Sequence, residues 1–355
     1  MSLTSAYFAE PAFPTLASSL LGDSFRETTK RTSRETVHDD ALSRHDGQSS
    51  QEWSLKHDIE IGLRSDKDSI FRCGTITGFS RLREGNADED KARVGELPRY
   101  LLSAHLRRTI PSHPSEPRAF IIHSPTSSTF SPEALLGSLL SSRDEPHLSH
   151  DEAIELLDSV QTLSVLDFAT AIQAISYVSD ALNQIQQQRN QLRQNQGQES
   201  SSESCNGPIL VIIEGIDTLA EGLIRTSSPL RGTALLVPVL RTLTHLSRTY
   251  ASFLSIMLVN TRVLGSIYTN RNSNASSAPP GQEQQVNADG DRNEGLHSVF
   301  LHRATSTALL PTILSRSIDQ GIDTHLLLSK VNGRNVVEVI KDRVGRGLGR
   351  WCVCD

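Results

Sequence analysis

The sequence predicts an α/β protein built around a mostly parallel β-sheet. Residues 209–213 form an unbroken aliphatic run that ends at Glu214, and a second apolar run, residues 253–259, ends at Asn260-Thr261. Short runs of this kind are typical of strands buried on both faces. The segment between them carries apolar residues at helical spacing, namely Leu236, Leu240, Leu243, Leu246 and Tyr250. The order strand, acid, helix, strand indicates a nucleotide-binding domain whose ligand site lies at the carboxyl ends of the strands.

Length and charge limit the class of protein further. At 355 residues the chain has room for one large domain or two small ones, and 37% hydrophobic residues suit a globular protein with some disordered parts. The formal net charge of -6 gives no general attraction to nucleic acid. Any contact with DNA therefore has to come from a local basic patch.

The cysteines and the termini point to a soluble intracellular protein. The four cysteines show no paired spacing of a disulfide framework, so we expect a reducing compartment. Cys352 and Cys354 supply only two of the four ligands of a zinc site, and we interpret them as strand thiols rather than as a metal site. The chain has no signal-peptide pattern and no apolar run near the roughly 20 residues of a membrane span.

The N-terminal third predicts a tail, a strand and a loop. Residues 1–50 are rich in polar and charged residues, so we expect a disordered tail, with the folded domain at 51–355. Ile59 and Ile61 suggest a short strand, and residues 70–79 predict a strand that enters a loop. A phosphate-binding loop would need the pattern G-x-x-x-x-G-K-[ST] there. The chain contains no Gly-Lys dipeptide, and residues 80–98 hold an unrelated segment that precedes a helix at 99–106.

Helix caps mark the middle of the chain. Residues 118–122 predict a strand, after which Ser131 is a natural N-cap and Pro132 a natural first helical residue. Ser149 and Glu152 form a capping box for a helix that runs through Leu157. Residues 163–166 predict another strand. A long helix follows, with one apolar face made by Ile172, Ile175, Val178, Leu182 and Ile185.

Two low-complexity insertions interrupt the domain. Residues 186–206 begin with a glutamine run, for which a solvated linker is favoured over a helix extension that binds a partner. Residues 266–296 are rich in Asn, Ser, Gln and Pro, and Tyr268 is their only aromatic residue. Because base stacking has little platform there, we expect disorder rather than a DNA-binding loop.

The C-terminal part predicts an antiparallel hairpin. Its apolar runs are residues 323–329, 336–340 and 349–353. A basic cluster follows the second run, made by Lys341, Arg343, Arg346 and Arg350. Two interpretations stay open for this cluster: a patch that contacts DNA phosphates, or a charged turn that protects a sheet edge.

Several of these blocks together resemble one family. Gly74-Thr75-Ile76-Thr77, Thr129-Phe130 with Pro132-Glu133, the strand ending at Glu214, Arg231-Gly232 and Val259-Asn260-Thr261 occur in order, as do residues 323–328 and 349–351. The same order is found in the RecA-like core of eukaryotic Rad-type recombinases and their paralogues. The resemblance covers about residues 70–265 and 298–353. It implies a RecA-like, P-loop-NTPase-type core, with a loop at Arg231-Gly232.

The chain departs from this family at its catalytic positions. Carried over by resemblance, Glu96 takes the place of the phosphate-binding Lys, Leu97 that of the magnesium-binding hydroxyl, and Ser127 that of the Glu that activates water. No catalytic residue remains. Glu214, at the position of the magnesium-holding acid, with Asp217 nearby and Gly95, marks a degenerate nucleotide site, so binding of ATP and magnesium is doubtful.

The resemblance implies a role in homologous recombination. We expect a nuclear, non-catalytic mediator subunit in double-strand-break repair, which assembles with other Rad-type recombinase paralogues and meets single-stranded or damaged DNA through that complex. The alternative is an active DNA-dependent ATPase with an atypical site. A third possibility is that residues 80–96 reflect a mispredicted exon boundary and that the true loop is intact.

Overall fold

The computed structural model describes residues 15–16, 54–63, 69–82, 94–108, 116–141, 147–195, 207–264, 296, 298–300, 312–343, 345 and 347–354. Most of the predicted N-terminal tail, the segment 83–93 and the predicted insertion from 266 to 295 lie outside these residues, as does Arg346. No helix in the described part is long and apolar enough to cross a membrane.

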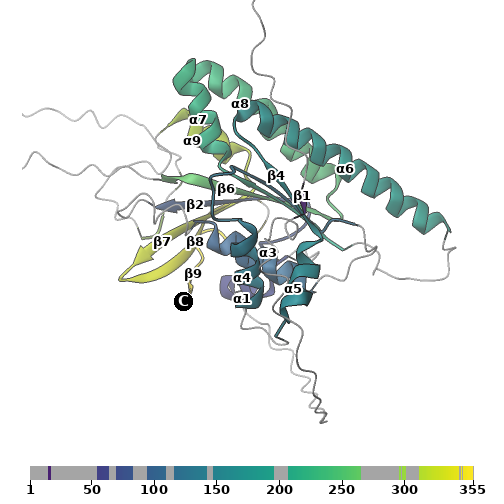
Figure 1. Cartoon of the computed structure of the whole chain (residues 1–355). Helices are drawn as coiled ribbons and strands as arrows, with labels where there is room; N and C mark the ends of the chain where they lie inside the picture. Colours follow the sequence, from purple (N-terminus) through teal and green to yellow (C-terminus); the bar gives the residue numbers. More distant parts are fainter. Residues whose placement is uncertain are drawn as a thin grey trace, which may run out of the picture.

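One sheet organises the described residues (Figure 1). Its strands are β1 Thr15–Leu16, β2 Ile76–Leu82, β3 Ala119–His123, β4 Val160–Ser164, β5 Ile209–Glu214, β6 Leu254–Leu264, β7 Thr324–Val331, β8 Arg334–Asp342 and β9 Trp351–Cys354. They lie in the order β1-β4-β3-β5-β6-β2-β7-β8-β9. All neighbours from β4 to β7 are parallel, and β7, β8 and β9 pair antiparallel. This confirms the predicted α/β class with a mostly parallel sheet and a C-terminal antiparallel hairpin.

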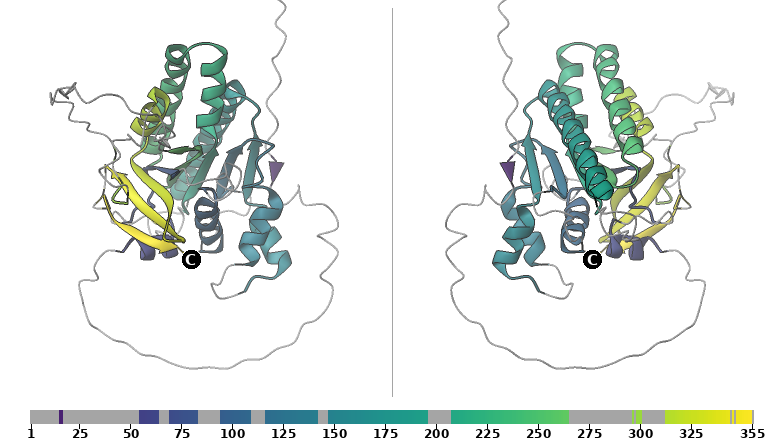
Figure 2. Two further views of the ribbon diagram at one scale, coloured as in Figure 1. Left: turned by 90° about the vertical axis from the view of Figure 1, so that its left-hand side faces the viewer. Right: turned by 90° about the vertical axis from the view of Figure 1, so that its right-hand side faces the viewer.

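Helices cover both faces of the sheet (Figure 2). They are α1 Leu55–Ile61, α3 Glu96–Arg108, α4 Pro132–Leu140, α5 His150–Leu157, α6 Phe168–Asn195, α7 Ile216–Thr226, α8 Pro229–Thr249 and α9 Ile313–Gln320. Apolar side chains of α6, α7, α8 and α9 form one core against the sheet. Those of α1, α3, α4 and α5 form a second core on the opposite face.

Strand β5 lies between these two cores. Ile209, Val211 and Ile213 pack into the first core, whereas Leu210 and Ile212 pack into the second. All six residues of the strand are buried. An uninterrupted aliphatic run is what such a strand requires, because both of its faces are removed from water.

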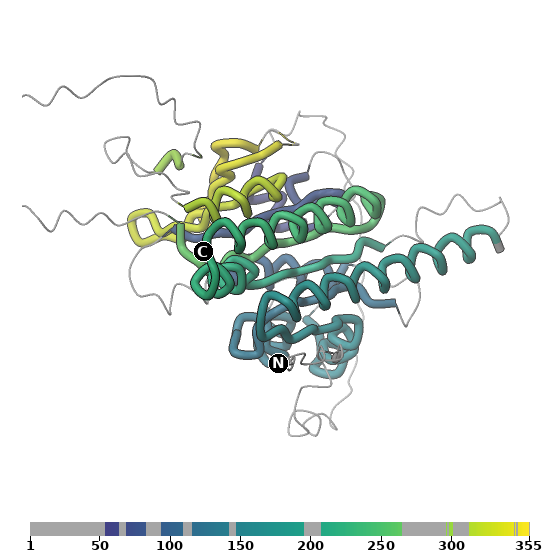
Figure 3. The backbone as a smooth tube through the Cα atoms, turned by 90° about the horizontal axis from the view of Figure 1, so that it is seen from above, coloured from purple at the N-terminus to yellow at the C-terminus, as the bar shows by residue number. Residues whose placement is uncertain are grey.

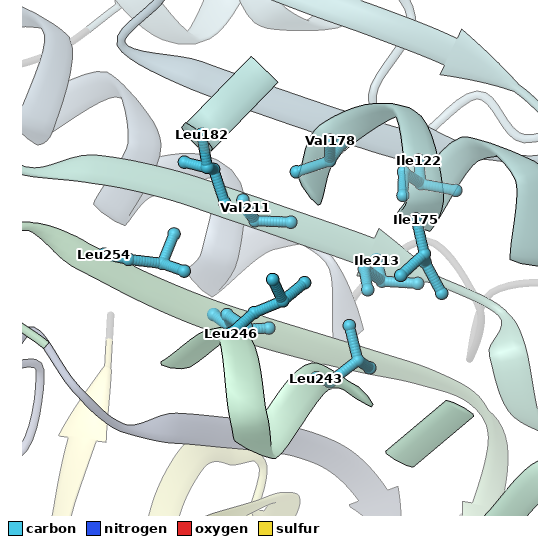
Figure 4. Close-up of a pocket in the computed structure, with 10 residues that line it drawn as sticks. Ile122, Ile175, Val178, Leu182, Val211, Ile213, Leu243, Leu246 and Leu254 are labelled. Atoms are coloured by element: carbon cyan, nitrogen blue, oxygen red, sulfur yellow. The ribbon is translucent and has the colours of Figure 1, made fainter. Parts of the chain in front are cut away.

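A small apolar pocket lies in the first core, between α6, α8 and the central strands (Figure 4). Its lining consists of aliphatic side chains from Ile122, Ile175, Val178, Leu182, Val211, Ile213, Leu243, Leu246, Leu254 and Ile256. Ligand sites combine apolar walls with a few convergent polar groups. This lining offers none, so the space is a packing gap in the core and not a binding site.

The predicted strand at Ile59 and Ile61 is wrong, because these residues belong to helix α1. Leu55 and Ile59, four residues apart, are buried on one face of that helix. Gly62, with φ of 72°, ends it. A spacing of two residues in so short a segment is compatible with either element, and tertiary packing selects the helix.

Three other elements differ from prediction. Strand β4 begins at Val160 and ends at Ser164, and Leu166, predicted to be in it, is 73% exposed. Thr15–Leu16, inside the predicted disordered tail, pairs antiparallel with β4. Helix α9, which sequence patterns did not reveal, has only two turns and begins at a capping box made by Thr312 and Ser315.

Helix α6 continues through the predicted linker as far as Asn195 and is the longest helix drawn (Figure 3). Arg189 anchors this extension. It is buried, forms an ion pair with Glu116, donates to the Gly207 carbonyl at 2.9 Å and lies 4.6 Å from the centroid of the Phe253 ring. A helix therefore continues through residues 186–195, where a linker was favoured, while binding of a partner by this helix stays a prediction. Residues 196–206 lie outside the described part.

The predicted loop at Arg231-Gly232 is also wrong, because both residues lie in the first turn of α8. The Ser228 hydroxyl caps this turn by accepting a hydrogen bond from the Arg231 amide. Gly232 packs so closely on α7 that a Cβ atom would lie 2.2 Å from Cγ1 of Ile224. The glycine therefore allows two helices to approach each other.

Candidate nucleotide site

The predicted site residues gather at the carboxyl ends of the parallel strands. Glu214 ends β5, the segment 124–131 follows β3, and Gly95 immediately precedes α3. Because β3 and β5 are parallel neighbours, these ends meet at one edge of the sheet. This is the edge at which open α/β sheets bind ligands.

Glu214 is almost completely buried, with 4% of its surface exposed. Burial raises the pKa of its carboxyl group, hydrogen bonds from the Ser127 and Thr129 side chains oppose that rise, and the charge of Asp217 adds to it. Its Oε2 atom has no hydrogen-bond partner within the described residues. The carboxylate therefore faces two neutral hydroxyl groups in a poorly solvated place.

Thr129 links Glu214 to Gly95. Gly95 is buried, and a Cβ atom at this position would lie 1.9 Å from Cγ2 of Thr129. The Arg99 guanidinium donates to the Thr129 carbonyl at 2.9 Å, which holds the loop after β3 against the first turn of α3. Gly95 and Glu214 are thus brought to one place, as predicted, but the Thr129 side chain lies against both.

The two positions that the family uses for phosphate and magnesium binding lack the required side chains here. Glu96 is exposed, and Leu97 packs into the second core with 8% of its surface exposed. Neither offers the cation or the hydroxyl that a triphosphate with magnesium requires. The segment 83–93 lies outside the described residues.

Asp217 has a different role from the one predicted. Its Oδ1 accepts hydrogen bonds from the Thr261 amide at 3.2 Å and hydroxyl at 3.1 Å, and its Oδ2 accepts one from the Arg262 amide at 2.6 Å. Burial raises the pKa of this carboxyl group, and the backbone hydrogen bonds oppose the rise. Both oxygens are engaged, so Asp217 fastens α7 to β6 and does not extend the site around Glu214.

A buried polar chain near the end of β2 escaped the sequence analysis. Ser80 Oγ lies 2.8 Å from His325 Nε2 and accepts a hydrogen bond from Asn260 at 2.8 Å, while His325 Nδ1 lies 2.9 Å from Asp319 Oδ1. The order Asp, His, Ser is that of a catalytic triad. Ser80 is fully buried inside a paired strand, however, so this chain joins β2, β6, β7 and α9 and offers a substrate no access. Its members are up to 245 residues apart.

The basic cluster is split by the fold. Lys341 turns inward, where its ammonium group lies 2.7 Å from Asp319 Oδ2, and burial lowers its pKa against the effect of that partner. Arg343 is exposed and donates to the Gln320 carbonyl at 2.9 Å, and Arg350 is exposed just before β9. Arg346 lies outside the described residues. Of the four predicted DNA-binding residues, two are therefore placed at the surface.

Cys352 and Cys354 lie in β9, as predicted, with their sulfur atoms 3.9 Å apart on one side of the strand. Both are free thiols and partly buried. In the described part of the chain, no group of three or more His, Cys, Asp or Glu residues could hold a metal ion.

Comparisons with known proteins add little to this description. No family model matches the sequence, and no curated protein matches it. Among solved structures, the crystal structure of the RadB recombinase aligns with a TM-score of 0.39 and 12% sequence identity, covering 79% of this chain and 86% of that chain. At this level the similarity carries no argument about function. The fold class rests on the strand order and on the connections within the sheet.

Proposed function

We propose that this chain is a RecA-like subunit in homologous recombination, which assembles with other Rad-type recombinase paralogues and does not hydrolyse ATP. The family blocks in the sequence and the strand order of the sheet support the recombination context. A nuclear location and a role in repair of DNA double-strand breaks follow from that context. In this proposal the RecA-like core acts as a scaffold for partners.

The arrangement of Glu214, Thr129 and Gly95 is the observation that carries the non-catalytic part. Phosphoryl transfer from ATP depends on positioned cations around the phosphates and on a group that orients the attacking water. Around Glu214 the described residues instead supply two hydroxyl groups and a buried carboxylate, and the nearby Arg99 guanidinium is engaged by the Thr129 carbonyl. The raised pKa of Glu214 disfavours the charged form that magnesium would need. Ser127, at the family's position for the activating Glu, is a poor general base.

Titration with a fluorescent ATP analogue tests this part. We expect no tight, magnesium-dependent binding to the purified full chain and no ATP hydrolysis with or without DNA.

Glu214→Gln keeps the shape of the side chain but removes its charge, so it should stabilise the fold or leave it unchanged, because a desolvated charge is lost. Circular dichroism melting of both proteins measures this.

The active ATPase remains the second candidate, because Glu214 ends the central strand and its Oε2 atom is not engaged by the described residues. Tight binding that requires magnesium and disappears in Glu214→Ala, while the melting temperature is retained, would establish that alternative.

Co-expression with each Rad-type paralogue of the same organism tests the scaffold role. We expect a stable heteromer that forms without ATP, and a chain that stays monomeric with all of them contradicts it.

A further inference from the structure

Two thiol groups meet at the last strand of the described sheet. Cys352 and Cys354 lie in β9, and because they are two residues apart in a strand, their side chains point to the same face. Their sulfur atoms are 3.9 Å apart, and neither residue is in a disulfide. The extended backbone alone therefore brings the two sulfur atoms together.

The pair lies where the second core reaches solvent. Val337 of β8, opposite Cys352, is buried, whereas Asn335, opposite Cys354, is exposed. Both cysteine side chains pack against the second core, and each residue keeps part of its surface exposed. In the described sheet no strand lies beyond β9. The pair is therefore at the margin of the core, within reach of a small ligand.

A disulfide bond fits this arrangement poorly. Residues two apart in a strand have Cα atoms about 6.6 Å apart, near the upper limit of about 6.8 Å for a disulfide. The sulfur atoms would also have to close from 3.9 Å to about 2.0 Å. Such closure would bend β9, although all four of its residues are paired with β8. The extended strand therefore favours two separate sulfur atoms.

A single metal ion spans the same gap without bending the strand. At the metal–sulfur distance of about 2.3 Å that zinc has, sulfur atoms 3.9 Å apart make an angle of about 116° at the metal. Zinc, however, needs four protein ligands in a structural site, and an iron–sulfur cluster needs four as well. The described residues contain no group of three or more His, Cys, Asp or Glu that could hold a metal ion. The ion must therefore be satisfied by two thiolates.

Cu⁺ meets this requirement. It is a soft cation that thiolate ligands select, and with a filled d shell it is stable with only two of them. Two-coordinate Cu⁺ favours a wide angle at the metal, and a small rotation of both side chains away from each other provides it. The same two residues that are too few for zinc are therefore sufficient for Cu⁺.

Metal binding by this pair has to displace protons. A hydrogen bond with Cys354 and burial raise the pKa of Cys352 above its ordinary value, whereas the charge of Lys56 on α1 lowers it. Glu60, which also raises this pKa, forms an ion pair with Lys56 at 4.0 Å. At neutral pH the pair therefore holds its protons, and a bound metal ion replaces them.

We propose that Cys352 and Cys354 together bind one Cu⁺ ion, with one bond from each sulfur atom. Two S–H bonds break, two S–Cu bonds form and two protons leave to solvent, so the oxidation states of copper and sulfur stay the same. The bound ion would hold β9 in its extended form at the margin of the sheet. The inference goes beyond the proposed function, because it involves neither the residues around Glu214 nor a protein partner.

Competition with a chromophoric Cu⁺ chelator tests this site. The sequence contains four cysteines, so the full chain with Cys73→Ser and Cys205→Ser keeps only this pair. Under anaerobic conditions we expect this chain to take one Cu⁺ from the chelator, and to take less as the pH falls, because protons compete for the thiolates. X-ray absorption at the copper edge should find two sulfur neighbours.

Single substitutions in that background show whether both sulfur atoms are needed. Cys352→Ser and Cys354→Ser should each lose the bound Cu⁺, because a hydroxyl is a hard donor that Cu⁺ does not prefer. Cys354→Met should retain part of the uptake, since a thioether is also a soft ligand. Restoring Cys73, a partly buried thiol outside β9, is the matched control and should not add a second ion. Melting curves establish that each variant folds.

Three outcomes overturn the inference: no transfer from the chelator, unchanged transfer in either serine variant, or more than two sulfur neighbours around copper. Zinc bound at one ion per two chains, together with a zinc-dependent dimer, would overturn it too, because the pair would then be half of a four-thiolate site between copies. Failure here leaves the proposed function standing, because ATP binding and heteromer formation are measured without copper. Conversely, tight magnesium-dependent ATP binding would remove the non-catalytic role and leave this pair untouched.

Discussion

At the scale of single residues, burial decides how the ionisable groups of this core behave. Glu214 and Asp217 carry raised pKa values because desolvation outweighs their hydrogen bonds. His105, on α3, shows the opposite shift for the same reason: burial lowers its pKa to about 4. In each case the neutral form is favoured, since a low-dielectric interior penalises charge of either sign.

The lowered pKa of His105 makes stability depend on pH. The unfolded chain binds this proton near pH 6.5 and the folded chain only near pH 4, so the contribution of His105 is present above pH 6.5 and is lost as the pH falls towards 4. We expect a loss of up to roughly 3 kcal/mol over that interval. Urea unfolding at pH 7.0, 5.5 and 4.5 measures it.

His105→Gln provides the comparison, because it keeps a polar side chain but removes the titration. Glu214 and Asp217 act with the opposite sign, since their raised pKa values favour the folded state as the pH falls, and they are the same in both proteins. The variant should therefore lose less stability on acidification than the parent protein. Parallel pH profiles for the two would show that His105 is not the source.

At the scale of elements, the first turn of α3 and the loop after β3 have to fit together. The close approach of Gly95 to Thr129 and the hydrogen bond from Arg99 to the Thr129 carbonyl join them. A glycine is needed here for space and not for its backbone angles, because its φ is not positive. This contact also keeps Thr129 beside Glu214, so packing and site chemistry depend on the same residues.

Gly95→Ala tests this contact. The added methyl group would overlap Cγ2 of Thr129 at 1.9 Å, and we expect a loss of about 1–3 kcal/mol in the free energy of unfolding. Thr129→Ser removes that methyl group and keeps the hydroxyl, so the double variant should recover most of the loss. A double-mutant cycle by urea denaturation measures the coupling. A neutral Gly95→Ala, or additive effects of the two changes, would contradict the contact.

At the scale of the whole molecule, stability depends on two cores that share the central sheet. Ile212 shows this, because it is fully buried, belongs to the second core and lies between Ile121 of β3 and Met257 of β6. A disruption at this position would displace both neighbouring strands, and with them helices α4, α6 and α8, which are joined to the central strands.

Ile212→Asp should therefore unfold the domain. An unpaired carboxylate in the centre of the sheet costs more than about 4 kcal/mol, which is a large share of the stability of a typical domain. Leu235→Asp, at a position on α8 that is 42% exposed, is the control and should melt close to the parent protein. Thermal melts followed by circular dichroism compare them. A cooperative transition at the parent temperature in Ile212→Asp would refute the placement of β5.

Much of the fold could be read from local patterns. The buried run of β5, the Ser131 cap with Pro132, the capping box at Ser149 and the antiparallel C-terminal strands all appear in the structure as predicted. These features depend on residues near one another in the chain, where side-chain periodicity and backbone hydrogen bonding act directly. The local order of residues alone therefore specifies them.

The candidate site and the surface were settled by contacts between distant residues. Arg189 and Glu116 are 73 residues apart, and their pairing accompanies a helix in a stretch predicted to be a linker. Lys341 forms an ion pair with Asp319 inside the protein, and Asp217 accepts hydrogen bonds from backbone amides of β6, so neither acts as predicted. No local pattern encodes such choices, because an ionisable side chain takes whichever partner the folded chain places beside it, and that depends on which strands and helices become neighbours.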